Sequence, residues 1–235
     1  MPSAGQIRRR LGRRALVVAS AATLLLSTVM VGTASAHGST IDPPSRNYGC
    51  WERWGSDFQS PDMATEDPMC WQAWQADTTA MWNWNGLYRE HVAGNHQAAI
   101  PDGQLCSAGR TGGDRYAALD VPGEWHATEV DNDFTVTVHD QAHHGADYIR
   151  IYVTEQGYDP VTEPLGWDDL ELVADTGLLA PGEGRPENSY PLNGVSIDID
   201  VHAPGRTGRH VVYMIWKASH YDQTFYACSD VVFPG

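Results

Sequence analysis

Residues 133–140 read DFTVTVHD and residues 194–203 read GVSIDIDVHA, and both stretches alternate apolar and polar side chains. A period of two places the apolar side chains on one face, which is typical of a half-buried β-strand. Three more runs are rich in β-branched and aromatic residues, namely 148–155 (YIRIYVTE), 209–218 (RHVVYMIWKA) and 224–233 (TFYACSDVVF). Short strands joined by long connections predict a mainly β fold, an antiparallel β-sandwich.

The segment from about residue 48 to 116 has a different composition, rich in Trp, Asn, Gly and Cys. It contains six of the nine tryptophans: Trp51, Trp54, Trp71, Trp74, Trp82 and Trp84. Residues 69–76 (MCWQAWQA) and 80–91 (AMWNWNGLYREH) are candidate helices. We therefore predict a large loop-and-short-helix insertion on one side of the sandwich. Residues 177–191 (GLLAPGEGRPENSYP) are predicted to be a loop from their Gly and Pro content.

The first 36 residues have the pattern of a secretory signal peptide. Basic residues 8–14 (RRRLGRR) precede the apolar run 15–32, and a small-residue triplet, ASA, ends at Ala36. The paired arginines are compatible with general or twin-arginine export. Removal of residues 1–36 would leave a single secreted domain over 37–235, long enough for a core of its own.

The charge of the chain excludes several classes of partner. The formal net charge is −15, and loss of the five arginines in residues 1–36 would make it −20. Nucleic acids and anionic membranes need basic patches, so we expect neither as a partner. A neutral polymer is compatible with an acidic surface, and we expect the domain to be a monomer.

Four cysteines lie in the predicted mature domain: Cys50, Cys70, Cys106 and Cys228. An even number in an exported chain predicts two disulfides, and spacing leaves three pairings open. A zinc site is the alternative, and it is disfavoured because the sequence has no C-x-x-C pair.

Cleavage after Ala36 would make His37 the first residue of the mature chain. Its free amine and its Nδ1 could then chelate one metal ion, with copper favoured among divalent ions. Another histidine would be needed, and the pair in residues 140–148 (DQAHHGADY) lies in a predicted turn between two strands. The competing interpretation is a set of ordinary loop histidines, and spacing does not choose between His143 and His144.

Aromatic and acidic residues suggest two further interpretations. Trp82 and Trp84 stand two apart in a polar stretch, so one of them could stack on a neutral sugar, whereas Trp71, Trp74 and Trp216 are predicted to be core residues. The acidic pairs, such as Asp198 and Asp200, could form a glycosidase site, but on an alternating strand they fit a solvated face better.

Seven stretches together resemble one known family: residues 37–55, 66–74, 81–88, 101–109, 144–148, 166–173 and 208–231. In this order they are similar to the bacterial lytic polysaccharide monooxygenases of auxiliary activity family ten. The resemblance is strongest to actinobacterial cellulose-active members with mixed C1/C4 oxidation. It implies an immunoglobulin- or fibronectin III-like sandwich.

The resemblance also implies a copper site and its neighbours. His37 would supply its amine and Nδ1 to one copper ion, and His144 the third nitrogen. Ala142 and Phe225 match the residues that crowd the two axial sides of the copper. Gln223 matches a residue that positions the oxygen species.

The substrate surface and disulfides follow from the same resemblance. Trp82, Asn83 and Asn85 match the flat surface that faces the polysaccharide, and a polar residue at position 85 is typical of the mixed C1/C4 subgroup. The implied disulfides are Cys50–Cys70 and Cys106–Cys228.

The implied activity is oxidative cleavage of β-1,4-glycosidic bonds in crystalline cellulose, with chitin as a further candidate. An external electron donor would reduce the copper, and hydrogen peroxide or dioxygen would be the cosubstrate. Two alternatives remain: a non-catalytic cellulose- or chitin-binding protein, and a secreted copper-binding or copper-delivery protein.

Overall fold

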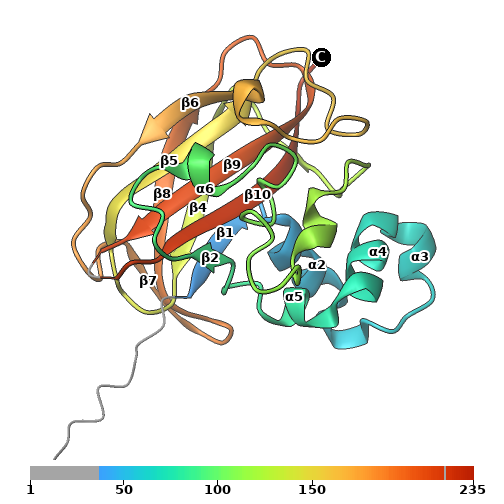
Figure 1. The fold of residues 1–235 in the computed structure, drawn as a ribbon, viewed down its shortest axis with the longest axis horizontal. Coiled ribbons are helices and arrows are strands. Elements are labelled where there is room, and N and C mark those ends of the chain that lie inside the picture. The colour runs from blue at the N-terminus through green and yellow to red at the C-terminus, as the bar shows by residue number, and fades with distance from the viewer. Residues whose placement is uncertain (1–36, 220) are drawn as a thin grey trace, which may run out of the picture. The chain divides into compact units, whose positions relative to one another are not determined.

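The computed structural model describes residues 37–219 and 221–235, and the predicted signal peptide lies outside them. The described residues form two sheets packed face to face, with most of the short helices gathered at one side (Figure 1). The prediction of a mainly β sandwich with a helical insertion is therefore confirmed.

The smaller sheet has the strand order β1-β4-β8-β7. Its strands are β1 (Gly38–Asp42), β4 (Asp133–Asp140), β8 (Leu192–His202) and β7 (Arg185–Ser189). The larger sheet has the order β2-β10-β9-β5-β6, and a short strand β3 pairs in parallel with β10. These strands are β2 (Tyr88–Arg89), β3 (Thr128–Glu129), β5 (Ala146–Thr154), β6 (Leu170–Asp175), β9 (Gly208–Ala218) and β10 (Thr224–Phe233).

All five predicted strands are present, and one predicted loop is partly wrong. Residues 185–189 lie within the stretch predicted as a loop, yet they form β7 along the edge of β8. Its side chains are mostly exposed, so β7 has no apolar face for a sequence pattern to reveal. An edge strand is held by backbone pairing with its one neighbour, which polar residues permit.

The short helices occupy the predicted insertion and two nearby segments. They are α2 (Arg46–Trp54), α3 (Met63–Glu66), α4 (Pro68–Ala76), α5 (Thr78–Trp82) and α6 (His96–Ala99), with single 3₁₀ turns at Gly55–Asp57, Ala117–Asp120 and Trp167–Asp169. The helix predicted over 80–91 is wrong beyond Trp82. There the Asn83 side-chain amide donates to the carbonyl of Thr79 and closes the last turn of α5.

The larger sheet separates two apolar clusters. On one face of β9 and β10, Trp216 and Phe225 pack against residues such as Val138 of the smaller sheet. On the other face, Tyr213 and Tyr226 pack against the helical segment, whose central side chain is Trp74. Trp74 and Trp216 are buried, as predicted, whereas Trp71 is only half-buried.

The two ends of strand β10 lie at different distances from the start of β1. Near its start, Phe225 pairs with Tyr88 of β2 and Trp216 of β9, and at its end Phe233 pairs with Gly208. Ten residues of extended chain span about 30 Å. In Figure 1 the carboxyl terminus lies at the end of the molecule opposite to the start of β1.

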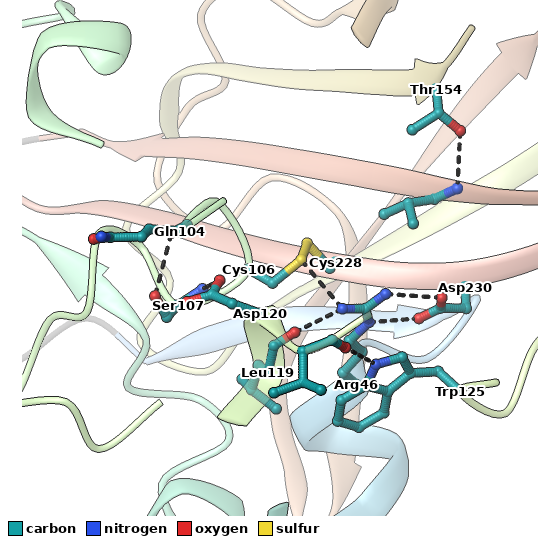
Figure 2. The surroundings of a disulfide bond; sticks show 12 residues. Arg46, Gln104, Cys106, Ser107, Leu119, Asp120, Trp125, Thr154, Cys228 and Asp230 are labelled. Atoms are coloured by element: carbon teal, nitrogen blue, oxygen red, sulfur yellow. Dashed lines mark hydrogen bonds and ion pairs between the residues drawn. A yellow bond between two sulfur atoms is a disulfide. The ribbon is translucent and has the colours of Figure 1, made fainter. Parts of the chain in front are cut away.

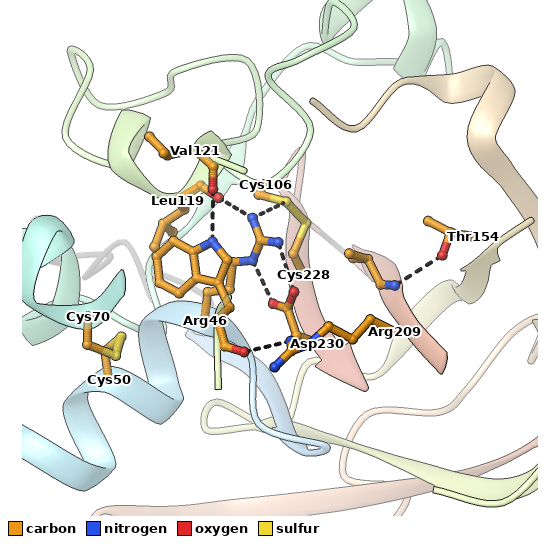
Figure 3. A network of polar contacts seen from close by, with 12 residues as sticks. Arg46, Cys50, Cys70, Cys106, Leu119, Val121, Thr154, Arg209, Cys228 and Asp230 are labelled. Carbon is orange, nitrogen blue, oxygen red and sulfur yellow. Dashed lines mark hydrogen bonds and ion pairs between the residues drawn. A yellow bond between two sulfur atoms is a disulfide. The ribbon is translucent and has the colours of Figure 1, made fainter. Parts of the chain in front are cut away.

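A buried ion pair joins α2 to β10 (Figures 2 and 3). The Arg46 guanidinium donates from Nε to Asp230 Oδ2 at 2.7 Å and from Nη2 to Oδ1 at 3.0 Å. Its Nη1 donates to the Leu119 carbonyl at 2.6 Å, and its plane lies 4.8 Å from the centre of the Trp125 ring. Both charged side chains are almost fully buried, so each depends on the other for solvation.

The structure contains two disulfides, Cys50–Cys70 and Cys106–Cys228, which is the pairing that the resemblance implies. The first links α2 to α4 and spans 20 residues. The second links the loop before residue 117 to β10, next to Arg46, and spans 122 residues. The longer link restricts the unfolded chain more and is expected to contribute more stability. No described helix has the length and apolarity needed to cross a membrane.

The histidine of α6 lies between two tyrosine hydroxyls. His96 Nδ1 is 2.9 Å from the Tyr226 hydroxyl, and its Nε2 is 2.9 Å from the Tyr148 hydroxyl. Burial, and secondarily the nearby Arg150 charge, lowers the pKa of His96 from 6.5 to about 4. The folded protein therefore keeps this imidazole neutral under mildly acidic conditions.

We predict that replacing Asp230 by Ala destabilises the mature chain by about 3–5 kcal/mol, because the Arg46 guanidinium is then buried without a counter-charge. Urea unfolding followed by tryptophan fluorescence measures the change. The control is Asp175→Ala, which removes the partner of the more exposed Arg150 and should cost less than about 1 kcal/mol. Equal losses in the two variants would contradict the assignment.

We also predict that His96 makes stability fall at acidic pH. Between pH 6.5 and about 4 the unfolded chain binds a proton at this residue and the folded chain does not. Its contribution is therefore complete above pH 6.5 and is lost as the pH falls toward 4. Thermal melts of His96→Gln should show a shallower decline across this window than the parent, and an unchanged slope would refute the prediction. The exposed His202→Gln is the matched control.

Candidate metal centre

A buried carboxylate shapes the loop that follows β4. Asp140 Oδ1 accepts from the Ala142 N–H and its Oδ2 accepts from the Gly145 N–H, both at 3.0 Å. The chain turns back sharply there, because His143 and Gly145 both have positive φ values. As a result His143 is exposed, whereas His144 is buried with its ring edge-on to Tyr221 at 4.5 Å.

His37 is held against the same loop by its backbone. The Gln141 N–H donates to the His37 carbonyl at 2.8 Å, and the Gly38 N–H donates to the Asn85 carbonyl at 2.8 Å. The next residue, Gly38, pairs with Asp140 at the end of β4. The start of β1 is therefore fixed between the His144 loop and the turn that follows α5.

Trp216 of β9 contacts the residue that follows each of the two histidines. Its indole Nε1 donates to the Gly145 carbonyl at 2.9 Å. A Cβ atom at Gly38 would lie 2.6 Å from its ring and 2.1 Å from the His139 carbonyl oxygen, so only glycine fits there. Trp216 thus contacts the residue after His37 and donates a hydrogen bond to the residue after His144.

The remaining residues predicted for the copper site lie on β10, in the loop after β4 and between β9 and β10. Phe225 is fully buried and stacks on Trp216 at 4.7 Å between ring centres. Ala142 belongs to the loop that Asp140 holds. Gln223 is buried in the connection between β9 and β10, where its carbonyl accepts from the Ala218 N–H.

The three predicted substrate residues differ in exposure. Trp82 is 48% exposed and packs edge-on against Trp74, whereas Trp84 is buried, so the two rings do not share one buried face, as their spacing suggests. Asn83 is exposed. The half-buried Asn85 donates from Nδ2 to Gln141 Oε1 at 2.5 Å.

A hollow of about 290 Å³ opens beside His37. Its lining includes Asn83, Tyr88 and Arg115. Small molecules can therefore approach His37 from the side of the helical segment.

Four residues that contact the candidate metal centre or its loops were not predicted to belong to it. Asp140, Gln141 and Tyr221 received no role, and Trp216 was assigned only to the core. Asp140 carries a usable signal, since an Asp that begins a Gly-containing turn commonly accepts backbone N–H groups. Tyr221 and Gln141 act through spatial neighbours, which a single sequence does not display.

The donor set fits copper only if the chain begins at His37. Among the described residues no group of three or more His, Cys, Asp or Glu side chains could hold a metal. The imidazoles of His37 and His144 would be two of the donors, and the α-amine of a mature His37 would be the third nitrogen. Amine and imidazole nitrogens suit copper.

Comparison with known proteins decides the family. A family model described as "lytic polysaccharide mono-oxygenase, cellulose-degrading" matches residues 37–231. The chain belongs to this lytic polysaccharide monooxygenase family. The match begins at His37, and it includes all residues assigned above to the candidate metal centre.

Two solved members of the family are similar along most of the described chain. LPMO10B from Micromonospora aurantiaca is 63% identical, with a TM-score of 0.79, and the match covers 83% of this chain and 99% of that one. The cellulose-active CelS2, solved in complex with copper, is 30% identical with a TM-score of 0.69, over 85% of this chain and 100% of that one.

A curated relative is longer than this chain. The chitin-binding protein CbpD of Pseudomonas aeruginosa is 35% identical over 90% of this chain but only 51% of its own length. The chain therefore spans about half the length of this curated relative.

We predict that Asp140→Asn weakens copper binding by about tenfold or more, because an amide cannot accept from both N–H groups that hold the His144 loop. Calorimetric titration of the mature chain with Cu(II) measures the affinity. The control is Asp133→Asn, at the exposed far end of the same strand. Parent-like copper affinity in Asp140→Asn would show that the loop does not depend on this carboxylate.

Proposed function

We propose that the mature chain, beginning at His37, is a secreted copper-dependent monooxygenase that cleaves β-1,4-linked crystalline polysaccharide. The observation that carries the proposal is that Trp216 contacts Gly38, the residue after His37, and donates to the carbonyl of Gly145, the residue after His144, within a chain of this family. The two disulfides and the signal-like residues 1–36 support secretion.

Three nitrogens would hold one copper ion: the His37 amine, the His37 Nδ1 and a ring nitrogen of His144. When bound, copper supplies a redox centre that an external donor reduces and that activates hydrogen peroxide or dioxygen. Oxygen insertion into a C1–H or C4–H bond gives a hydroxylated carbon. The glycosidic bond at this carbon then breaks and releases the neighbouring sugar.

The chain's own residues orient and shield this chemistry. Asp140 and Trp216 hold the two histidines at fixed positions, so that neither imidazole must reorganise during the reaction. Phe225 and Ala142 would supply apolar surface beside the bound metal. We assign Gln223 to orienting the cosubstrate through its side-chain amide.

Cellulose is the substrate we propose, with cleavage at both C1 and C4. Trp82 offers an exposed ring for stacking on a sugar, and Asn83 and Asn85 offer amide groups to its hydroxyls. The bridge from Asn85 to Gln141 makes the surface beside His37 polar, as in the mixed C1/C4 subgroup that the chain resembles. Chitin is the second substrate to be tested, because CbpD is named a chitin-binding protein.

A non-catalytic polysaccharide-binding protein is the second candidate function. Two observations favour it: the exposed Trp82 ring needs no metal to bind sugar, and CbpD is named for binding alone. The two candidates differ in whether oxidised products form.

We predict that the chain beginning at His37, with copper and a reductant, releases C1- and C4-oxidised oligosaccharides from microcrystalline cellulose. A chain that keeps Ala36 should lose more than ~100-fold of this activity, because an amide replaces the amine ligand, and His144→Ala should lose as much. Mass spectrometry of the products measures the yield. No oxidised products from the parent, with cellulose binding retained in His144→Ala, would favour the binding protein.

A further inference from the structure

The most exposed large apolar or aromatic side chain of the described chain is Tyr190, at 87% exposure. It lies at the tip of the hairpin that joins β7 to β8, where Ser189 pairs with Leu192 and leaves only Tyr190 and Pro191 between them. Within the described residues, the Tyr190 side chain makes no hydrogen bond, ion pair or ring contact. The described contacts therefore give this ring no structural role.

A short chain of hydrogen bonds ties this hairpin tip to the candidate metal centre. The Gln141 Nε2 donates to the Pro191 carbonyl at 2.9 Å, and its Oε1 accepts from Asn85 at 2.5 Å. Its backbone N–H holds the carbonyl of His37. The residue beside Tyr190 is therefore one side chain away from His37.

The same chain continues to the exposed tryptophan on the helical segment. Asn85 follows Trp82 by three residues, in the turn after α5. Figure 1 shows β7, the start of β1 and α5 along one side of the molecule, in agreement with these bonds. Two exposed rings, Trp82 and Tyr190, thus lie at the two ends of the polar bridge formed by Asn85 and Gln141.

The hairpin tip is suited to rigid recognition. The register of β7 on β8 and the bond from Gln141 to Pro191 fix its backbone. A tyrosine on a fixed backbone loses little conformational freedom when it binds, and its ring can cover the apolar face of a sugar while its hydroxyl stays in water. The chain is acidic, so a neutral ligand suits this surface better than an anionic one.

We propose that Tyr190 is a second aromatic stacking position for the polysaccharide, across the Asn85–Gln141 bridge from Trp82. A glucan chain on the crystal surface would contact a ring on each side of the bridge, which would hold it in register over the neighbouring histidines. The identity of the ligand rests on the proposed function, whereas the exposure and position of the ring do not.

The test compares Tyr190→Leu with Tyr190→Phe in the copper-loaded chain that begins at His37. Leucine keeps apolar bulk but removes the ring, so binding to microcrystalline cellulose should weaken about threefold to tenfold. Phenylalanine keeps the ring and should bind within about twofold of the parent. Depletion isotherms measure binding, and Leu172→Ala, at an exposed apolar residue on β6, is the control.

Two results would overturn the proposal: parent-like binding by Tyr190→Leu, or an equal loss in Tyr190→Phe. A change in sedimentation coefficient between the parent and Tyr190→Leu would also overturn it, by assigning the ring to a contact between copies of the chain. If the parent releases no oxidised products but Tyr190→Leu binds cellulose more weakly, the catalytic proposal fails and this one stands. If the parent is active and Tyr190→Leu binds normally, only this one fails.

Discussion

The bond between Arg46 and Asp230 is the contact on which the arrangement of this chain depends. Arg46 begins α2, four residues after β1 ends, and Asp230 lies on β10, five residues after Phe225. The pair therefore ties the helix that follows β1 to the strand that carries Phe225. The guanidinium also holds the Leu119 carbonyl next to the Cys106–Cys228 disulfide, so one buried cation joins three segments (Figure 3).

Because the Arg46–Asp230 pair is buried, α2 and β10 stay joined or separate completely. A buried guanidinium costs several kcal/mol unless its partner is present, so partial loosening of α2 from β10 is strongly unfavourable. The helical segment carries Trp82 and Asn85, the loop between β4 and β5 carries His144, and β10 carries Phe225. A surface assembled from both parts keeps its geometry only if they do not shift against each other.

Periodicity in the sequence predicted the sandwich well, because strands with one buried face alternate visibly. It failed at β7, whose side chains are exposed and whose partner is chosen by backbone pairing alone. It also extended α5 too far, since a cap that a side-chain amide makes to the preceding turn is not a periodic signal. Of the candidate site, the sequence suggested His37 and left His143 and His144 open, and resemblance selected His144. The supports at Asp140, Gln141 and Tyr221 depend on contacts between loops that are distant in the sequence.

Strand β10 connects two ends of the molecule that face different surroundings. Its first residues include Phe225, which stacks on Trp216, and its last residues, about 30 Å away, pair with the start of β9. A tether or a second module fused after Gly235 would extend away from the face proposed to bind polysaccharide. A residue added before His37 would instead lie at that proposed face. Immobilisation on a bead or fusion to a partner should therefore be made through the carboxyl terminus.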